Sequence, residues 1–122
     1  MSNTWIAIGA FSCSLAVIIG AFGAHGLKDV LTEYSRDVYE KGNFYHFIHS
    51  IALIINGILS KIFTQLDFLI SGYLFLLGII LFSFSLYALA ITDIKKLGAI
   101  TPVGGICFIF AWLYIGFKMY NS

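Results

Sequence analysis

Four long runs of apolar residues, separated by short polar or charged segments, limit the folds open to this chain. A helix rises 1.5 Å per residue and the hydrocarbon core of a bilayer is about 30 Å thick, so about 20 apolar residues are needed to cross it. The four runs cover approximately residues 4–24, 43–62, 68–92 and 99–120. We therefore predict an all-α membrane protein, with four transmembrane helices in one bundle.

The composition supports this class of protein. Of the 122 residues, 60% are hydrophobic and 11% are charged, whereas about 25% are charged in a typical soluble domain. The length allows a single domain covering residues 1–122. The net charge of +1 gives no indication of a nucleic-acid partner. The expected partner is the lipid bilayer, with a second copy of the chain or another membrane protein as further alternatives.

The first run contains small residues at a spacing that favours close helix packing. No Lys or Arg precedes the run, and it is longer than the apolar core of a signal peptide, so we interpret it as a retained helix. Ala16, Gly20 and Ala24 are each four residues apart, which lets two helix backbones approach closely in lipid. The other residues predicted to serve helix packing are Gly23, Gly104 and Gly105.

The charged segment after the first run, residues 27–41, has an apolar stripe with helical spacing. Leu27, Val30, Leu31, Tyr34 and Val38 fall on one helical face, and most of the other residues are charged or polar. This pattern predicts an amphipathic interfacial helix between spans one and two. A short helix that caps the bundle is the alternative.

Local signals also mark the ends of the third and fourth spans. Asp67 is predicted to cap the third span, and Thr101 to be the N-cap of the fourth, with Pro102 at its first helical position. Trp5 lies near the start of the first span and Trp112 in the second half of the fourth, which predicts one aromatic belt if both termini are on the same face. Cys13 and Cys107 lie inside apolar runs and are interpreted as small hydrophobic residues.

Four stretches together resemble a known family. They are GAFGAHGL at 20–27, YHFIHSIAL at 45–53, FSFSLYALA at 82–90, and TPVGG at 101–105 with Trp112 after it. This set is similar to domain-of-unknown-function family 423, which comprises small four-helix membrane proteins. Phe84 stands where that family usually has Gly, and His46 where it often has Gln. The resemblance implies the fold but no biochemical activity.

Polar and aromatic residues gather in one half of the predicted bundle, next to the loops between spans one and two and between spans three and four. The ligand-binding candidates are His25, Tyr45, His46, His49, Tyr87 and Thr101. Such a set can hold helices in register through neutral histidines, or bind a lipid head group, a small polar ligand, a metal or haem. We expect His49 to be neutral and hydrogen-bonded to Tyr87.

No motif indicates an enzyme. The chain has no nucleophile elbow, no phosphate-binding loop and no dinucleotide fingerprint. We predict no catalytic residue and no cofactor. The main interpretation is a structural or interaction component of the cell membrane. Binding through the His25, His46 and His49 half of the bundle, and an oligomeric transporter or channel for a small solute, are the alternatives.

The basic residues predict an orientation. Five of them belong to the half with the histidines and two to the opposite half: Lys28, Arg36, Lys41, Lys95 and Lys96 against Lys61 and Lys118. Because short loops rich in Lys and Arg remain in the cytoplasm, we expect both termini outside.

Overall fold

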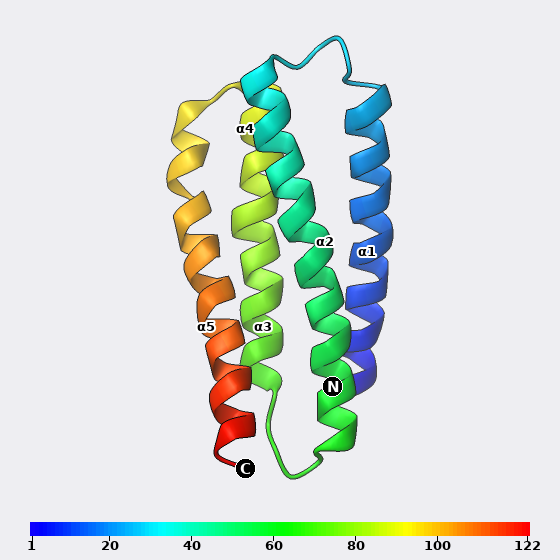
Figure 1. Ribbon diagram of the computed structural model, residues 1–122, viewed down its shortest axis with the longest axis vertical. Coiled ribbons are helices and arrows are strands. Elements are labelled where there is room, and N and C mark those ends of the chain that lie inside the picture. The colour runs from blue at the N-terminus through cyan, green and yellow to red at the C-terminus, as the bar shows by residue number, and fades with distance from the viewer.

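The computed structural model describes residues 1–122 and contains only helices and connecting loops (Figure 1). The elements are α1 (Ser2–His25), α2 (Glu33–Ile62), α3 (Leu69–Gly78), the π-helix η1 (Ile79–Phe84), α4 (Ser85–Thr92), the 3₁₀-helix η2 (Lys95–Ala99) and α5 (Thr101–Tyr120). Because α3, η1 and α4 follow one another without a break, the chain has four helical segments long and apolar enough to span a membrane. The all-α class and the four predicted spans are confirmed.

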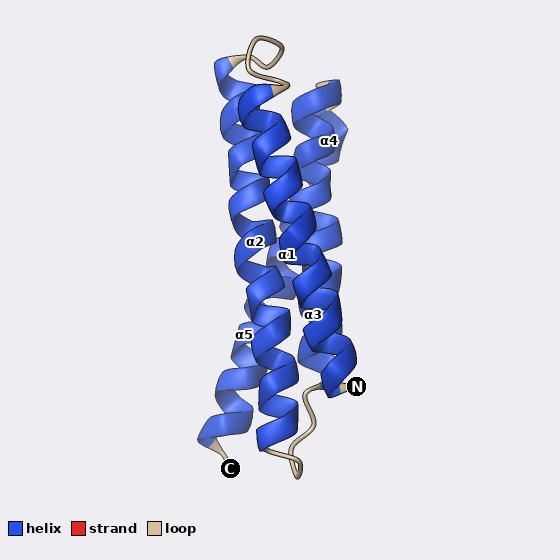
Figure 2. Cartoon of the chain, turned by 90° about the vertical axis from the view of Figure 1, so that its right-hand side faces the viewer, coloured by secondary structure: helices blue, strands red, loops and turns tan.

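The helices lie side by side in a flattened bundle that is broad in Figure 1 and narrow in Figure 2. α1 packs mainly on α2, α2 packs on α3, η1 and α4, and α5 packs on α3 and η1. Both termini lie at the same end of the bundle (Figure 1). The α1–α2 loop and the α4–α5 connection therefore share the opposite end, as an even number of spans requires.

The predicted interfacial helix over residues 27–41 is not a separate element. Residues 26–32 form a loop, and α2 begins at Glu33 and runs unbroken to Ile62. Thr32 is the N-cap, and its side-chain oxygen accepts a hydrogen bond from the Ser35 N–H. Val38 of α2 and Leu27 and Leu31 of the loop pack against the cluster of Tyr39, Tyr87 and Ala90, whereas Val30 and Tyr34 of the stripe are exposed. The second span thus begins about three turns before the predicted start at residue 43.

Glycines allow the close approach of neighbouring helices along most of the bundle. A Cβ added at Gly9 or Gly57 would lie within 2.7 Å of a backbone carbonyl oxygen of the facing helix, α2 or α1 respectively. A Cβ at Gly104 would lie 2.3 Å from the backbone nitrogen of Phe82. Such contacts bring backbones together where small residues, not apolar burial, drive helix association in lipid.

The predicted packing line of α1 is present in part. Ala16 is buried and Gly20 lies against Asn43, but Ala24 is exposed. The line continues through Gly23, which packs under the ring of Tyr39. In the fourth span, Gly105 has only ordinary van der Waals contact with Phe82.

The prediction that Trp5 belongs to an aromatic belt is wrong. Its side chain is only 1% exposed and packs on Gly72 of α3, with its ring edge-to-face on Tyr73 at a centroid distance of 5.1 Å. Trp5 is therefore a core residue and does not face lipid. Tyr120 is exposed, whereas Trp112 is half-exposed and donates a hydrogen bond into the bundle.

Candidate functional site

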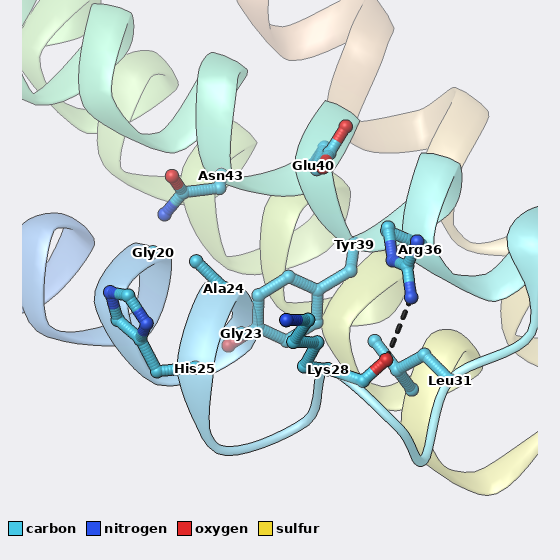
Figure 3. A pocket seen from close by; sticks show the side chains of 10 residues that line it. All are labelled: Gly20, Gly23, Ala24, His25, Lys28, Leu31, Arg36, Tyr39, Glu40 and Asn43. Carbon is cyan, nitrogen blue, oxygen red and sulfur yellow. Dashed lines mark hydrogen bonds between the residues drawn. The ribbon is translucent and has the colours of Figure 1, made fainter.

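The candidate site is a cavity of about 410 Å³ at the end of the bundle where α1 passes into α2 (Figure 3). α1 is about 36 Å long at 1.5 Å per residue, so its last turn reaches the interface of a bilayer with a core of about 30 Å. The cavity lies against that last turn, the 26–32 loop and the first turns of α2. Its lining residues are Gly20, Gly23, Ala24, His25, Lys28, Leu31, Arg36, Tyr39, Glu40 and Asn43.

Basic side chains surround the outer part of this cavity. Lys28 comes from the loop, Arg36 from the first turn of α2, and His25 from the end of α1. The guanidinium Nη2 of Arg36 donates a hydrogen bond of 2.7 Å to the backbone oxygen of Lys28, drawn as a dashed line in Figure 3. Arg36 thus holds the loop in place beside the cavity and keeps further donors on its guanidinium.

The wall of the cavity is built from small residues and one aromatic ring. Gly20, Gly23 and Ala24 present almost no side chain from α1, and Tyr39 lies opposite them on α2. The Tyr39 hydroxyl donates a hydrogen bond of 2.5 Å to the Ile19 carbonyl oxygen. A Cβ added at Gly23 would overlap the Tyr39 ring. The missing side chains on α1 therefore make room both for the ring and for the cavity.

Asn43 lies at the inner end of the cavity. Its amide nitrogen donates to the Ala16 carbonyl oxygen at 2.7 Å and to the Tyr87 hydroxyl oxygen at 3.2 Å. Both N–H groups of the amide are thereby used, which fixes the orientation of the side chain. The Asn43 carbonyl oxygen remains, and it lies beside Gly20.

A chain of buried hydrogen bonds continues from Asn43 into the bundle. The Tyr87 oxygen lies 2.9 Å from His46 Nδ1, and His46 Nε2 lies 3.0 Å from the Ser12 hydroxyl. Ser12 lies 2.5 Å from the Ser50 hydroxyl, which donates to the His46 carbonyl oxygen at 2.6 Å. Three helices, α1, α2 and α4, are joined in this way, so a hydrogen-bonded polar layer lies beneath the cavity.

The donors and acceptors in this chain can be assigned by counting protons. Ser50 has one hydroxyl proton and gives it to the His46 carbonyl, so Ser12 must donate to Ser50. His46 Nε2 must then donate to Ser12, and Nδ1 of the neutral ring accepts the Tyr87 proton. Every hydrogen bond in the layer is satisfied when His46 is neutral and carries its proton on Nε2.

His49 belongs to a different layer, on the other side of α2. Its Nδ1 lies 2.8 Å from the Tyr45 carbonyl oxygen and must donate to it, and its Nε2 accepts from the Trp112 indole at 3.0 Å. The ring is stacked on Phe108 at a centroid distance of 3.5 Å. The predicted hydrogen bond between His49 and Tyr87 is therefore wrong, because His46 is the partner of Tyr87.

The remaining predicted residues also lie apart. Tyr45 stacks on His49, and His25 lines the cavity near the bilayer interface. Thr101 is the first residue of α5, with Ile100 as the N-cap, so its predicted capping role is wrong. Its hydroxyl instead lies 2.6 Å from that of Ser85, joining α5 to α4. No group of three or more His, Cys, Asp or Glu residues lies close enough to hold a metal ion.

Sequence reasoning did not select four residues that build the site: Ser12, Lys28, Arg36 and Asn43. One signal was available, since Asn43 is four residues from Tyr39 and three from His46, which places all of them near one side of a helix. The contribution of Lys28 depends on how the loop folds back, which no periodicity encodes.

The chain matches the family described as "Protein of unknown function (DUF423)" over residues 19–105. The chain belongs to the DUF423 family. It is 42% identical over 113 residues to a UPF0382 membrane protein of Staphylococcus epidermidis, which covers 93% of this chain and 92% of the relative. It is 41% identical over 114 residues to the UPF0382 membrane protein YwdK of Bacillus subtilis, covering 93% of each.

Membership of DUF423 confirms the resemblance seen in the four sequence stretches. The staphylococcal protein SH2409 of Staphylococcus haemolyticus, also a UPF0382 membrane protein, is 44% identical over 111 residues, covering 91% of this chain and 90% of the relative. No solved structure matches the chain. The family and these relatives show a small membrane protein of unknown activity, so any function must be argued from the cavity.

Proposed function

We propose that this DUF423 protein is an integral protein of the bacterial cell membrane that binds the phosphate of a lipid head group between α1 and α2. The observation that carries the proposal is the basic cavity at the bilayer interface, formed by His25, Lys28 and Arg36. The bilayer is then both the solvent and the source of the ligand.

The charges of the cavity favour an anion. Lys28 and Arg36 are both cationic at neutral pH, and Glu40 is the only acid among the lining residues. Arginine and lysine bind phosphate oxygens through charge-assisted hydrogen bonds. Basic pockets between transmembrane helices are a recurring site for anionic lipid head groups.

The size and position of the cavity suit a head group. A volume of about 410 Å³ falls in the usual range for small-ligand sites, about 300–1,000 Å³. Gly20 and Ala24 lie on the last turns of α1, so the apolar lower part of the wall is within the membrane while Lys28 is at its edge. A lipid can enter sideways with its phosphate at the level of the cations.

The distribution of basic residues supports a location of this cavity in the cytoplasmic leaflet. Five Lys or Arg residues lie at the cavity end of the bundle and two at the end with the termini. In intact cells, a membrane-impermeant maleimide should label Ser122→Cys and spare Lys96→Cys, in a background with Cys13 and Cys107 replaced. Labelling of Lys96→Cys alone would place the cavity in the outer leaflet and contradict this assignment.

The arrangement of polar groups favours binding over transport. The buried polar layer around His46 ends at Ser50, and the next polar side chain along α2 is Asn56. Ala52 and Leu53 lie between them, and both are 0% exposed. A packed apolar layer of this kind separates the two halves of the bundle.

The experiment is lipid binding to delipidated protein in neutral detergent, measured by native mass spectrometry with phosphatidylglycerol. Lys28→Gln and Arg36→Gln should each reduce the lipid-bound fraction severalfold. Lys118→Gln and Lys61→Gln, at the opposite end of the bundle, are the matched controls and should leave it unchanged. Equal losses in all four variants would indicate nonspecific charge attraction and contradict the site.

A further inference from the structure

The Asn43 carbonyl oxygen is an acceptor without a hydrogen-bond partner at the inner end of the cavity. The donors of the same amide are committed to Ala16 and Tyr87, so the oxygen cannot exchange places with the nitrogen without breaking both bonds. Ser83 Oγ is the one fully buried side-chain polar atom that lacks a hydrogen-bond partner. The Asn43 oxygen also lacks a partner, so it is not fully buried. The oxygen is therefore available to a ligand.

Gly20 keeps this oxygen accessible from α1. A Cβ added at Gly20 would lie 2.7 Å from Asn43 Oδ1, in the space directly beside the acceptor. Both Gly20 and Asn43 line the cavity. The absence of a side chain at residue 20 thus exposes a hydrogen-bond acceptor where the basic residues do not reach.

A phosphate group cannot satisfy this acceptor. Ionised phosphate oxygens only accept hydrogen bonds, and two acceptors facing each other repel. The group that meets Asn43 must therefore carry a donor, while the phosphate stays with Lys28 and Arg36. A donor beyond the phosphate is either a hydroxyl or an ammonium.

The surrounding charge distinguishes these two donors. An ammonium would share the cavity with Lys28 and Arg36, which outnumber the one acid Glu40, and an added positive charge in a site of net positive charge is unfavourable. A neutral hydroxyl meets the Asn43 oxygen without that cost. We infer that the cavity selects an anionic phosphodiester lipid whose head group carries hydroxyls, of the phosphoglycerol class; this inference rests on the proposed function.

The test compares four lipids with one acyl composition: phosphatidylglycerol, phosphatidylmethanol (an anionic phosphodiester without a head-group hydroxyl), phosphatidylethanolamine and phosphatidylcholine. Each is titrated into delipidated protein and the bound fraction is measured by native mass spectrometry. Phosphatidylglycerol should bind about two- to tenfold more tightly than phosphatidylmethanol, the factor expected for one net hydrogen bond. The two zwitterionic lipids should bind more weakly still.

Gly20→Ala perturbs the acceptor, because a Cβ there would lie 2.7 Å from Asn43 Oδ1 and the Asn43 amide must shift to accommodate it. This variant should bind phosphatidylglycerol and phosphatidylmethanol equally. Gly116→Ala is the matched control, since a Cβ there meets nothing within 4 Å, and it should keep the wild-type preference. If Gly20→Ala does not fold, the wild-type comparison still decides.

The outcomes separate this inference from the proposed function. Equal wild-type binding of phosphatidylglycerol and phosphatidylmethanol, with both lost in Lys28→Gln, would overturn the hydroxyl selection and leave the phosphate site standing. Tighter binding of phosphatidylethanolamine would overturn it as well. Lipid binding that does not depend on Lys28 would overturn both. Full displacement of the lipid by soluble glycerol 3-phosphate at millimolar concentration would indicate that the ligand is a free phosphate ester, and would overturn the assignment to a lipid.

Discussion

The two ends of the bundle each contain an asparagine on α2 that binds other helices, and the two side chains are used differently. Asn56 is 0% exposed; its amide nitrogen donates to the Phe68 carbonyl oxygen at 3.0 Å, and its oxygen accepts from the Ser71 hydroxyl at 2.6 Å. Asn43 donates twice, but its oxygen faces a cavity. The Asn56 amide is hydrogen-bonded within the protein at both its nitrogen and its oxygen, whereas the Asn43 amide has an open acceptor, meaning an oxygen without a partner in the protein.

The difference separates polar residues that hold the fold from polar residues that can meet a ligand. Asn56 lies where α3 begins after the α2–α3 loop, and both ends of its amide are bonded inside the protein. The cavity near Asn56's end of the bundle has no basic side chain among its lining residues Met1, Ser2, Trp5, Ser60, Thr64, Leu66, Asp67, Phe68 and Leu69. A second hollow at that end has one basic side chain, Lys118, so a pair of cations and an open acceptor occur together only at the end with Asn43.

Replacing Asn56, whose amide nitrogen and oxygen are both hydrogen-bonded, should give the largest loss of stability. Asn56→Ala removes two buried hydrogen bonds, at about 0.5–1.5 kcal/mol each, although the Phe68 carbonyl still accepts from the Gly72 N–H and the Ser71 hydroxyl. The free energy of unfolding, measured by reversible denaturation in mixed micelles, should fall accordingly. Phosphatidylglycerol affinity of the folded protein should not change.

Asn43→Ala is the counterpart of that variant. It should lose less stability, because Asn43 is only half-buried, and it should weaken phosphatidylglycerol binding. If Asn56→Ala weakened lipid binding as strongly as Asn43→Ala does, the distinction between the two ends would be lost.

His46 tests whether the layer beneath the cavity acts as one unit. His46→Leu removes the acceptor for Tyr87 and the donor to Ser12, so we expect a loss of about 1–3 kcal/mol in unfolding free energy. His46→Gln keeps one donor and one acceptor and should lose less stability. Equal losses in thermal denaturation for Leu and Gln would show that the hydrogen bonds of His46 are not required.

His49 should respond more weakly, because it makes one hydrogen bond to another helix. Trp112→Phe removes the indole donor to His49 Nε2 and keeps the aromatic packing. The expected loss is about 0.5–1.5 kcal/mol. Nitrogen NMR should show His49 in the Nδ1–H form and His46 in the Nε2–H form. Finding both rings in one tautomer would contradict the hydrogen-bond assignments.

The spans could be predicted because apolar length alone determines them. The start of α2 could not, because the hydrophobic pattern changes at the interface while the helix continues: Thr32 caps it, and Tyr39 and Asn43 bind α1 through their side chains. Hydropathy indicates which residues lie within the membrane, and it does not indicate where a helix begins or ends.

The histidine pair shows why the site itself escaped prediction. His46 and His49 are three residues apart, which rotates them by about 60° around a helix of 3.6 residues per turn. That angle is small enough to suggest one shared face and large enough to bring the rings to different neighbours, Tyr87 and Trp112. Which neighbour each ring meets depends on the packing of α1, α4 and α5.

The most direct test of the account is the distance between lipid phosphorus and the Lys28 side-chain nitrogen. Protein with nitrogen-15 in its lysine side chains, reconstituted in phosphatidylglycerol bilayers, can be studied by phosphorus–nitrogen dipolar solid-state NMR, with Lys28→Gln to assign the signal. We predict strong dephasing of one lysine signal, lost in Lys28→Gln and retained in Lys118→Gln. A dephasing pattern that Lys28→Gln leaves unchanged would contradict the binding of a lipid phosphate in this cavity.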